Sequence, residues 1–273
     1  MSESAAATRA LTFNERLTAV QKATNSLLCV GIDPLPDRIP GGPGALGDFC
    51  RNVIEATADQ VCAYKPQIAH FSALGAEREL EALIRQIRDQ APGIPIILDA
   101  KRTDIGSTAE RYAVEAFERY GADAVTVSPY TGPEGLAPFL NWHDRGVIIL
   151  CRTSNAESDW LQCYPAEDPL YLRIARRAQE EWNTHGNVML VAGATHPADL
   201  GRIRQVAPDL ALLVPGIGEQ AGDVAAVLRH GCRNDGYGMV INSSRSIIYA
   251  GDGSPGAVRN AALDFNQRMR ELR

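Results

Sequence analysis

The chain has 273 residues, of which 27 are basic and 33 acidic, so its formal net charge at pH 7 is −6. This balance, without clusters of Lys and Arg, argues against a nucleic-acid-binding protein, which needs a basic surface for phosphates. No apolar run approaches the roughly 18 residues of a membrane span, and residues 1–11 lack the apolar core of a secretory signal. We expect a frayed tail over residues 1–11 and one folded domain over residues 12–273.

The six cysteines show neither a C-x-x-C spacing nor a cluster with histidines. We therefore expect no metal site and no disulfides, and we predict reduced thiols in a cytoplasmic protein. Lysine is rare in this chain. Of the 27 basic residues, only Lys22, Lys65 and Lys101 are lysines, and the others are arginines. Lysine can release a proton at useful pH and arginine cannot. Lys65 and Lys101 are therefore candidates for chemistry, whereas Lys22 falls on an amphipathic helix.

The first predicted element is a helix over residues 13–24. Eight short, mostly continuous apolar runs follow, as is typical of strands that are buried on both faces of a parallel sheet. These runs cover residues 27–32, 62–68, 94–98, 122–127, 147–151, 188–191, 210–214 and 239–241. The stretches between them have helical spacing, among them residues 49–61, 76–90, 108–120, 170–182 and 223–229.

Strands that alternate with helices indicate parallel strands joined by right-handed crossovers. Eight such units without a break in composition predict an α/β fold, a single (β/α)8 TIM barrel with an extra N-terminal helix. The alternative is an open doubly wound sheet, which usually carries a glycine fingerprint after its first strand, whereas Asp33 and Pro34 follow the first strand here. Residues 153–168 form the longest and most polar connection, as expected of a lid or binding loop.

Polar residues gather at the carboxyl ends of the predicted strands, where barrel enzymes place their active sites. In chain order they are Asp33, Lys65, Asp99 with Lys101, Ser128, Ser154, Thr195, residues 215–218 and residues 243–245. On a regular strand, side chains two apart share a face, so Asp99 and Lys101 are expected to contact each other. A structural ion pair is the alternative interpretation. Desolvated ion pairs seldom stabilise a fold, however, and the neighbouring Asp33 and Lys65 favour a functional site.

Nearby carboxylates favour the charged form of an amine, so we expect Lys101 to be a cation and proton donor. A Schiff-base lysine needs the opposite environment, which argues against an aldolase. Residues 215–222 are glycine-rich and precede a helix, so their N–H groups are suited to a phosphate. Arg245, after the last strand, can add a bidentate clamp. The pattern predicts a phosphorylated substrate.

Together these residues resemble the orotidine 5′-phosphate decarboxylase family, in its longer bacterial form. Asp99-x-Lys101-x-x-Asp104-Ile105-x-x-Thr108 is similar to the family signature, and the resemblance runs from the first strand to the last. Further segments that carry it are Gly31-Ile32-Asp33, Tyr64-Lys65-Pro66, Arg152-Thr153-Ser154-Asn155, Pro215-Gly216-Ile217-Gly218-x-Gln220 and Asn242-Ser243-Ser244-Arg245. One departure is Ala156, where the family often has proline.

The resemblance implies decarboxylation of orotidine 5′-phosphate to uridine 5′-phosphate and CO₂, the last step of de novo pyrimidine nucleotide synthesis, with no cofactor and no metal. It implies that Asp99, Lys101 and Asp104 form the charged network at the reacting carbon, with Lys101 donating the proton to ring carbon 6. The implied substrate-binding residues are Asp33 and Lys65 at the ribose, Ser154 at the pyrimidine amide, Gln220 between base and phosphate, Pro215 and Ser244 beside the nucleotide, and Arg245 at the phosphate.

The resemblance also implies a homodimer in which Asp104, Ile105 and Thr108 reach the active site of the partner. Two alternatives remain. Metal-dependent sugar-phosphate decarboxylases and synthases of the same barrel group share the D-x-K-x-x-D pattern, but they typically place a metal-binding glutamate after the second strand, where this chain has Lys65. A non-catalytic nucleotide-binding barrel would bind uridine 5′-phosphate without turnover.

Overall fold

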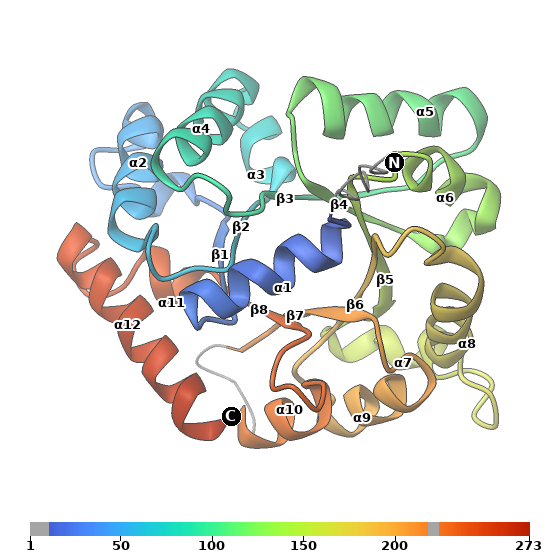
Figure 1. Cartoon of the computed structure of the whole chain (residues 1–273). Coiled ribbons are helices and arrows are strands. Elements are labelled where there is room, and N and C mark those ends of the chain that lie inside the picture. Colours follow the sequence, from blue (N-terminus) through green and yellow to red (C-terminus); the bar gives the residue numbers. More distant parts are fainter. Residues whose placement is uncertain (1–10, 218–223) are drawn as a thin grey trace, which may run out of the picture.

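The computed structural model describes residues 11–217 and 224–273, and within these ranges eight parallel strands form one sheet in the order β2-β1-β8-β7-β6-β5-β4-β3. Bridges from Tyr64 to Ile96 and from Gln67 to Asp99 join β2 to β3, so the sheet closes on itself (Figure 1). The predicted (β/α)8 barrel is confirmed, and the open sheet is wrong. The strands are β1 (Leu28–Ile32), β2 (Ala63–Pro66), β3 (Ile97–Arg102), β4 (Ala124–Val127), β5 (Gly146–Arg152), β6 (Val188–Ala192), β7 (Ala211–Pro215) and β8 (Met239–Ser243).

The helices surround the barrel in Figure 1. They are α1 (Phe13–Thr24), α2 (Leu46–Thr57), α3 (Ile68–Ser72), α4 (Glu77–Gln90), α5 (Gly106–Val114), α6 (Gly132–Leu140), α7 (Asp159–Gln162), α8 (Leu170–Arg177), α9 (Pro197–Val206), α10 (Val224–Gly231), α11 (Arg245–Ile248) and α12 (Pro255–Leu272). Both α5 and α8 continue into a π-helical turn. The predicted helices are present with small shifts at their ends, whereas the third strand continues past its predicted end at Leu98 to Arg102.

Helix α1 closes the end of the barrel at which the strands begin (Figure 1). A capping box between Thr12 and Glu15 starts the helix, and Phe13 and Leu17 are buried among side chains of the barrel interior. Phe13 fits because Gly146 has no side chain, since a Cβ there would lie 2.6 Å from the Phe13 ring. The predicted extra helix is confirmed, and it leaves the opposite end of the barrel open.

The strands are buried because helices cover their outer faces and because side chains from all the strands fill the barrel interior. Every residue of β1, β2, β4, β6 and β8 is buried, which explains why these segments read as continuous apolar runs. Among the buried polar side chains of the strands, Lys65, Thr126 and Ser243 lie in the last two residues of their strands, and Asp99 precedes the irregular last part of β3. The fold therefore separates a hydrophobic body from one polar rim.

The long connection after β5 is folded. It contains a 3₁₀ turn over Ala156–Ser158 and helix α7. Of the predicted tail over residues 1–11, the described residues include only Leu11, which is exposed.

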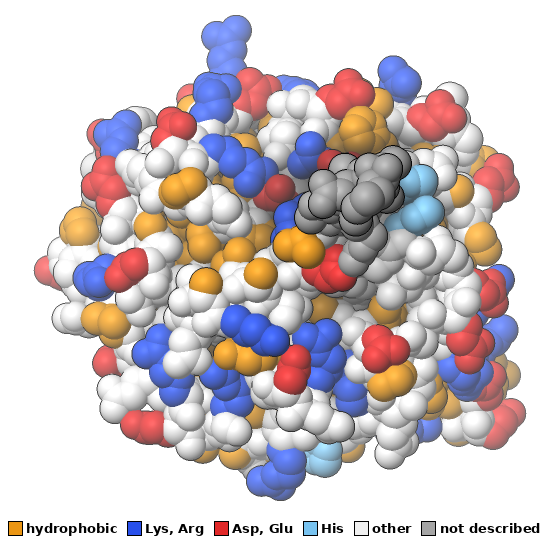
Figure 2. Space-filling model, viewed as in Figure 1, with side chains coloured by type: hydrophobic (Ala, Val, Ile, Leu, Met, Phe, Trp, Pro, Cys, Tyr) orange, Lys and Arg blue, Asp and Glu red, His pale blue; other side chains and the backbone are white. Residues whose placement is uncertain are grey.

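No described helix is long and apolar enough to cross a membrane. All six cysteines are free thiols, in agreement with the expected lack of disulfides. On the face shown in Figure 2, acidic and basic side chains are both spread over the surface.

Candidate active site

The centre of the polar rim is a carboxylate between two ammonium groups. Asp99 on β3 accepts a hydrogen bond from Lys65 Nζ on β2 at 2.8 Å and another from Lys101 Nζ at 2.6 Å. The Lys65 and Asp99 side chains are only 8% and 9% exposed, whereas that of Lys101 is 48% exposed. Lys65 is therefore held inside the wall, while Lys101 presents its charge to the open end of the barrel.

The contact between Asp99 and Lys101 is confirmed, but the predicted reason for it is wrong. Lys101 has a left-handed backbone with φ of +47°, and the register between β3 and β4 shifts between Leu98 and Arg102. Regular alternation therefore does not bring the two side chains together. Left-handed backbone at a residue other than glycine is costly, and such residues gather at functional sites.

Thr126 on β4, which is not among the predicted site residues, holds this irregular turn. Its hydroxyl donates to Asp99 Oδ1 at 2.9 Å and accepts from the backbone N–H groups of Ala100 and Lys101, each at 3.0 Å. The available signal was a hydroxyl residue between the apolar Val125 and Val127 in the run over residues 122–127. Thr126 thus fixes both the carboxylate of Asp99 and the backbone that carries Lys101.

The two lysines determine the charge of Asp99. Burial by itself raises the pKa of this carboxyl, but the ammonium groups of Lys65 and Lys101 outweigh burial and lower the pKa from 3.8 to about 2. Asp99 is therefore a carboxylate at every physiological pH. The cluster of Lys65, Asp99 and Lys101 carries a net positive charge when both amines are protonated, which suits an anionic ligand.

A cavity of about 810 Å³ adjoins the ends of β1, β7 and β8. Its lining includes Asp33, Gly216, Asn242, Ser244 and Arg245. Arg245 Nε lies 3.7 Å from Asp33 Oδ2. The cavity therefore brings together the acid expected at the ribose and the arginine expected at the phosphate.

Two residues that line this cavity, Asp33 and Asn242, each carry a buried oxygen suited to a donor group of a ligand. Asp33 Oδ1 and Asn242 Oδ1 have no hydrogen-bond partner among the described residues. Buried polar atoms are rarely left unpaired, so each is suited to a donor group of a bound molecule. Gly31 leaves room for two of the lining side chains, because a Cβ there would lie 2.0 Å from Ser244 Oγ and 2.9 Å from Asn242 Oδ1.

Ser154 lies at the same end, between β6 and β7. Its carbonyl accepts from Thr195 Oγ1 at 3.2 Å, and a Cβ on Gly193 would come within 2.8 Å of its Cα. A Cβ on Gly216 would lie 3.6 Å from Ser154 Cβ. Pro215 accepts a backbone hydrogen bond from Ala194 at 2.9 Å. Ser154 and Pro215 therefore take the rim positions that the sequence analysis predicts.

Among the described residues, no hydrogen bond or ion pair joins Asp104, Ile105 or Thr108 to the central cluster. Asp104 Oδ1 accepts from the backbone N–H of Ile105 at 2.8 Å, and no ion pair joins it to Lys101 among the described residues. Ile105 is 56% exposed although it is apolar. Within one chain, then, the predicted network contains Asp99 and Lys101 but not Asp104. Gln220 lies outside the described residues.

The sequence analysis did not single out Arg38 and Tyr249, which also line the large cavity. The Arg38 guanidinium lies 4.1 Å from the centre of the Tyr249 ring, and the Tyr249 hydroxyl accepts from the backbone N–H of Leu35 at 2.6 Å. Neither residue stands at a predicted strand end, so position in the sequence carried no signal for them.

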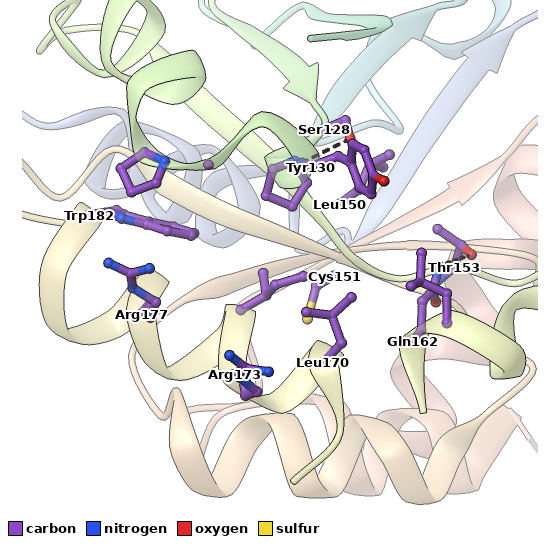
Figure 3. A pocket seen from close by; sticks show the side chains of 15 residues that line it. Ser128, Tyr130, Leu150, Cys151, Thr153, Gln162, Leu170, Arg173, Arg177 and Trp182 are labelled. Atoms are coloured by element: carbon purple, nitrogen blue, oxygen red, sulfur yellow. Dashed lines mark hydrogen bonds between the residues drawn. The ribbon is translucent and has the colours of Figure 1, made fainter. Parts of the chain in front are cut away.

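A second cavity of about 380 Å³ opens between the connection after β4 and helices α7 and α8 (Figure 3). Its lining is mostly apolar, with Leu150, Leu170 and Trp182, and with Thr153 and Gln162 at one side. None of the predicted substrate residues lines it, so the large cavity at β1, β7 and β8 is the better candidate for the nucleotide.

Comparison with known proteins agrees with this geometry. The sequence model of the family described as "Orotidine 5′-phosphate decarboxylase / HUMPS family" matches residues 26–259. The chain belongs to this family. The match begins just before β1 and ends in α12, so the whole barrel carries the family pattern.

Named relatives within the family are similar over nearly their full length. The orotidine 5′-phosphate decarboxylase of Cupriavidus necator is 52% identical over 270 residues, which cover 96% of this chain and 99% of the relative. That of Ralstonia nicotianae is 53% identical over 264 residues, which cover 95% and 97%. The solved structure of Leishmania donovani OMP decarboxylase matches with a TM-score of 0.85 and 42% identity, covering 96% of this chain and 98% of the other.

The end of β2 distinguishes this chain from the expected metal-dependent members of the barrel group. The resemblance described above leads us to expect a metal-binding glutamate there in those members, whereas here Lys65 occupies the position and pairs with Asp99. In the part of the chain that the structure describes, no group of three or more His, Cys, Asp or Glu side chains is arranged to hold a metal.

The low pKa of Asp99 predicts a pH-dependent stability. A lowered folded-state pKa contributes stability above the unfolded value of 3.8, and this contribution is lost as the pH falls toward 2. At 1.36 kcal/mol per pKa unit, the loss is about 2 kcal/mol. The free energy of unfolding, measured by urea denaturation, should therefore fall more steeply between pH 4 and pH 2 in the wild type than in Asp99→Asn.

Asp264→Asn, a substitution at an exposed position of α12, serves as the matched control and should follow the wild-type curve. Parallel curves for the wild type and Asp99→Asn over this pH range would show that the two lysines do not depress the pKa of Asp99.

Proposed function

We propose that the chain converts orotidine 5′-phosphate to uridine 5′-phosphate and CO₂. The observation that carries the proposal is the half-exposed Lys101 ammonium, paired at 2.6 Å with Asp99 at the open end of the barrel. Full-length similarity to named orotidine 5′-phosphate decarboxylases supports the choice of substrate.

The reaction leaves an electron pair that the pyrimidine ring cannot delocalise. When the C6 carboxylate departs as CO₂, the C–C bond pair remains on carbon 6 in the plane of the ring. An ammonium group beside that carbon stabilises the charge and then delivers the proton. At about 3 Å and an effective dielectric constant of about 20, this attraction amounts to roughly 5 kcal/mol. Lys101 is suited to both roles because its amine lies at the open end of the barrel and is held by the carboxylate of Asp99.

Asp99 and Lys65 keep this ammonium in place. Asp99 is ionised and accepts from Lys65, Lys101 and Thr126, so its position is determined from three neighbouring strands. After Lys101 gives up its proton, Asp99 and Lys65 remain as a neutral pair. Lys65 therefore prevents the cluster from being left with an uncompensated buried carboxylate, which would be costly.

The attraction at carbon 6 supplies only part of the barrier reduction, because large enzymatic accelerations need up to about 23 kcal/mol. Binding energy from remote parts of the substrate supplies more, provided that it is realised in the transition state. The large cavity is suited to this role. In this cavity Arg245 would hold the phosphate, and Asp33 Oδ1, which has no partner among the described residues, would accept a ribose hydroxyl. Ser154, beside the lining residue Gly216, would contact the amide of the base.

We also propose that the active site is shared between two copies of the chain. Asp104, Ile105 and Thr108 follow β3 but do not join the cluster in their own chain, and the exposed Ile105 offers an apolar contact. The family resemblance implies that these three residues reach the partner's site, which supports the proposal. A partner's Asp104 beside Lys101 would give the ammonium a second carboxylate neighbour.

The proposed reaction uses only side chains of the protein and needs neither a cofactor nor a metal. The six free thiols support a cytoplasmic location, where cysteines stay reduced.

The function is tested with the purified chain and orotidine 5′-phosphate in EDTA, by following the loss of orotate absorbance. We expect full turnover in the wild type. Lys101→Ala should lose at least about 1,000-fold in kcat, because both the charge and the proton donor are gone, yet it should still bind uridine 5′-phosphate.

Lys22→Ala, which changes a lysine on α1 at the closed end of the barrel, should keep wild-type activity. Substantial activity in Lys101→Ala would overturn the role of this lysine. Loss of wild-type activity in EDTA would favour the metal-dependent alternative, and tight uridine 5′-phosphate binding without turnover would favour the non-catalytic barrel.

The shared site is tested by mixing two inactive variants, Lys101→Ala and Asp104→Ala. After subunit exchange, each mixed dimer has one site with both substitutions and one site with neither. Random exchange should therefore restore about one quarter of the wild-type activity, if two-fold symmetric dimers form. A mixture that stays as inactive as its components would show that Asp104 acts only within its own chain or only on folding.

A further inference from the structure

Arg152, the last residue of β5, is an arginine buried inside the protein wall. Its side chain is only 2% exposed. Arginine is almost never this buried unless its donors are all paired, because removing the charge from water is expensive. It stands two residues before Ser154, the residue proposed to contact the base.

Every nitrogen of the Arg152 guanidinium has a side-chain partner. Nε donates to Asp199 Oδ2 on α9 at 2.8 Å. Nη1 donates to Ser158 Oγ at 2.6 Å and, more weakly, to Gln162 Oε1 at 3.4 Å. Nη2 donates to Asp159 Oδ1 at 2.5 Å. Three of these partners lie in the folded connection that begins with Thr153.

These contacts extend to both sides of Ser154. Ser158 Oγ donates to the carbonyl of Asn155 at 2.7 Å, directly after Ser154. Gln162 accepts from the N–H of Thr153 at 2.9 Å and donates to its hydroxyl at 2.8 Å, directly before Ser154 (Figure 3). The guanidinium thus holds the residues on either side of Ser154 through two short chains of hydrogen bonds.

The partner of Arg152 on α9, Asp199, is itself held by a second hydrogen bond. Asp199 Oδ1 accepts from the Tyr171 hydroxyl at 2.9 Å, so both carboxylate oxygens of Asp199 are used. The Arg152 guanidinium lies 5.8 Å from the centre of the Tyr171 ring. Arg152 therefore joins the connection after β5 to α8 and α9, the helices behind the rim.

We propose that Arg152 is a positioning residue that places Ser154 for recognition of the pyrimidine base. The role given to Ser154 rests on the proposed function. Arg152 does not reach the substrate itself. It acts by holding the connection over residues 153–162 against α9, so that the Ser154 hydroxyl keeps a single position at the rim. Affinity for the base, rather than for the sugar phosphate, should therefore depend on Arg152.

Stabilisation of the fold alone is a weaker explanation of the contacts that Arg152 makes. Buried ion pairs contribute little net stability compared with apolar side chains of similar size. An arginine whose purpose was stability alone would not need three partners in one short connection. Preorganisation of a binding group, in contrast, requires its flanking residues to be held by side chains that are themselves fixed.

The test compares uridine 5′-phosphate, which has the base, with ribose 5-phosphate, which lacks it. In Arg152→Met, the affinity for uridine 5′-phosphate should fall about tenfold, the effect of a lost polar contact, while the affinity for ribose 5-phosphate changes less than about twofold. KM for orotidine 5′-phosphate should rise by a similar factor. In a Ser154→Ala background, Arg152→Met should weaken uridine 5′-phosphate binding no further, because both changes remove the same contact.

Arg204→Met is the matched control. Arg204 donates to the carbonyls of Leu210 and Gly231, at the amino-terminal side of β7 and β8. Its loss should lower the thermal stability but leave the ratio of the two affinities unchanged. Equal weakening of both ligands by Arg152→Met, or no change in either, would overturn the proposal.

Two further measurements keep the test decisive. Asp159→Asn leaves Arg152 and its partner on α9 intact, and it should weaken uridine 5′-phosphate binding in the same direction but less. Amide hydrogen exchange should be faster over residues 153–162 in Arg152→Met and not in Arg204→Met. Unchanged exchange would contradict the positioning role. Absence of orotidine 5′-phosphate turnover in the wild type would instead refute the proposed function, while the exchange data would still decide whether Arg152 holds the connection.

Discussion

The site depends on one buried carboxylate between two amines. Asp99 accepts from Lys65 on β2, from Lys101 on β3 and from Thr126 on β4, so three adjacent strands must be in register for the cluster to form. The arrangement leaves one ammonium inside the wall and one at the opening. A closed parallel barrel satisfies these conditions because it brings the carboxyl ends of all its strands to one rim.

One end of the barrel stabilises the fold, and the other end carries the candidate active site. At one end, Phe13 and Leu17 of α1 fill the interior with apolar surface, which stabilises the fold. At the other end, the structure keeps features that are costly by themselves. They include a left-handed backbone at Lys101 and buried oxygens on Asp33 and Asn242 that have no partner in the described part of the chain. Burial elsewhere in the barrel offsets these costs, and donor groups of a bound nucleotide, such as its ribose hydroxyls, would satisfy the two acceptor oxygens.

Much of this could be predicted from the sequence. Continuous apolar runs identified the strands, and the polar residues after them located the rim, because both patterns depend on neighbours close in the chain. Three features could not be predicted in this way. Thr126 contacts Asp99 through the pairing of two strands, and the left-handed turn at Lys101 replaces the regular alternation that the sequence predicts. Arg152 belonged to a recognised motif, but its partner Asp199 is far away in the chain.

The central claim is that the Lys101 ammonium, held by Asp99, meets the electron pair on carbon 6. A crystal structure of the chain with bound uridine 5′-phosphate tests it most directly. We expect Lys101 Nζ within about 3.5 Å of carbon 6, a reacting distance, with its contact to Asp99 intact. A nucleotide bound with carbon 6 far from Lys101 Nζ, or a Lys101 turned away from Asp99 in the complex, would contradict it.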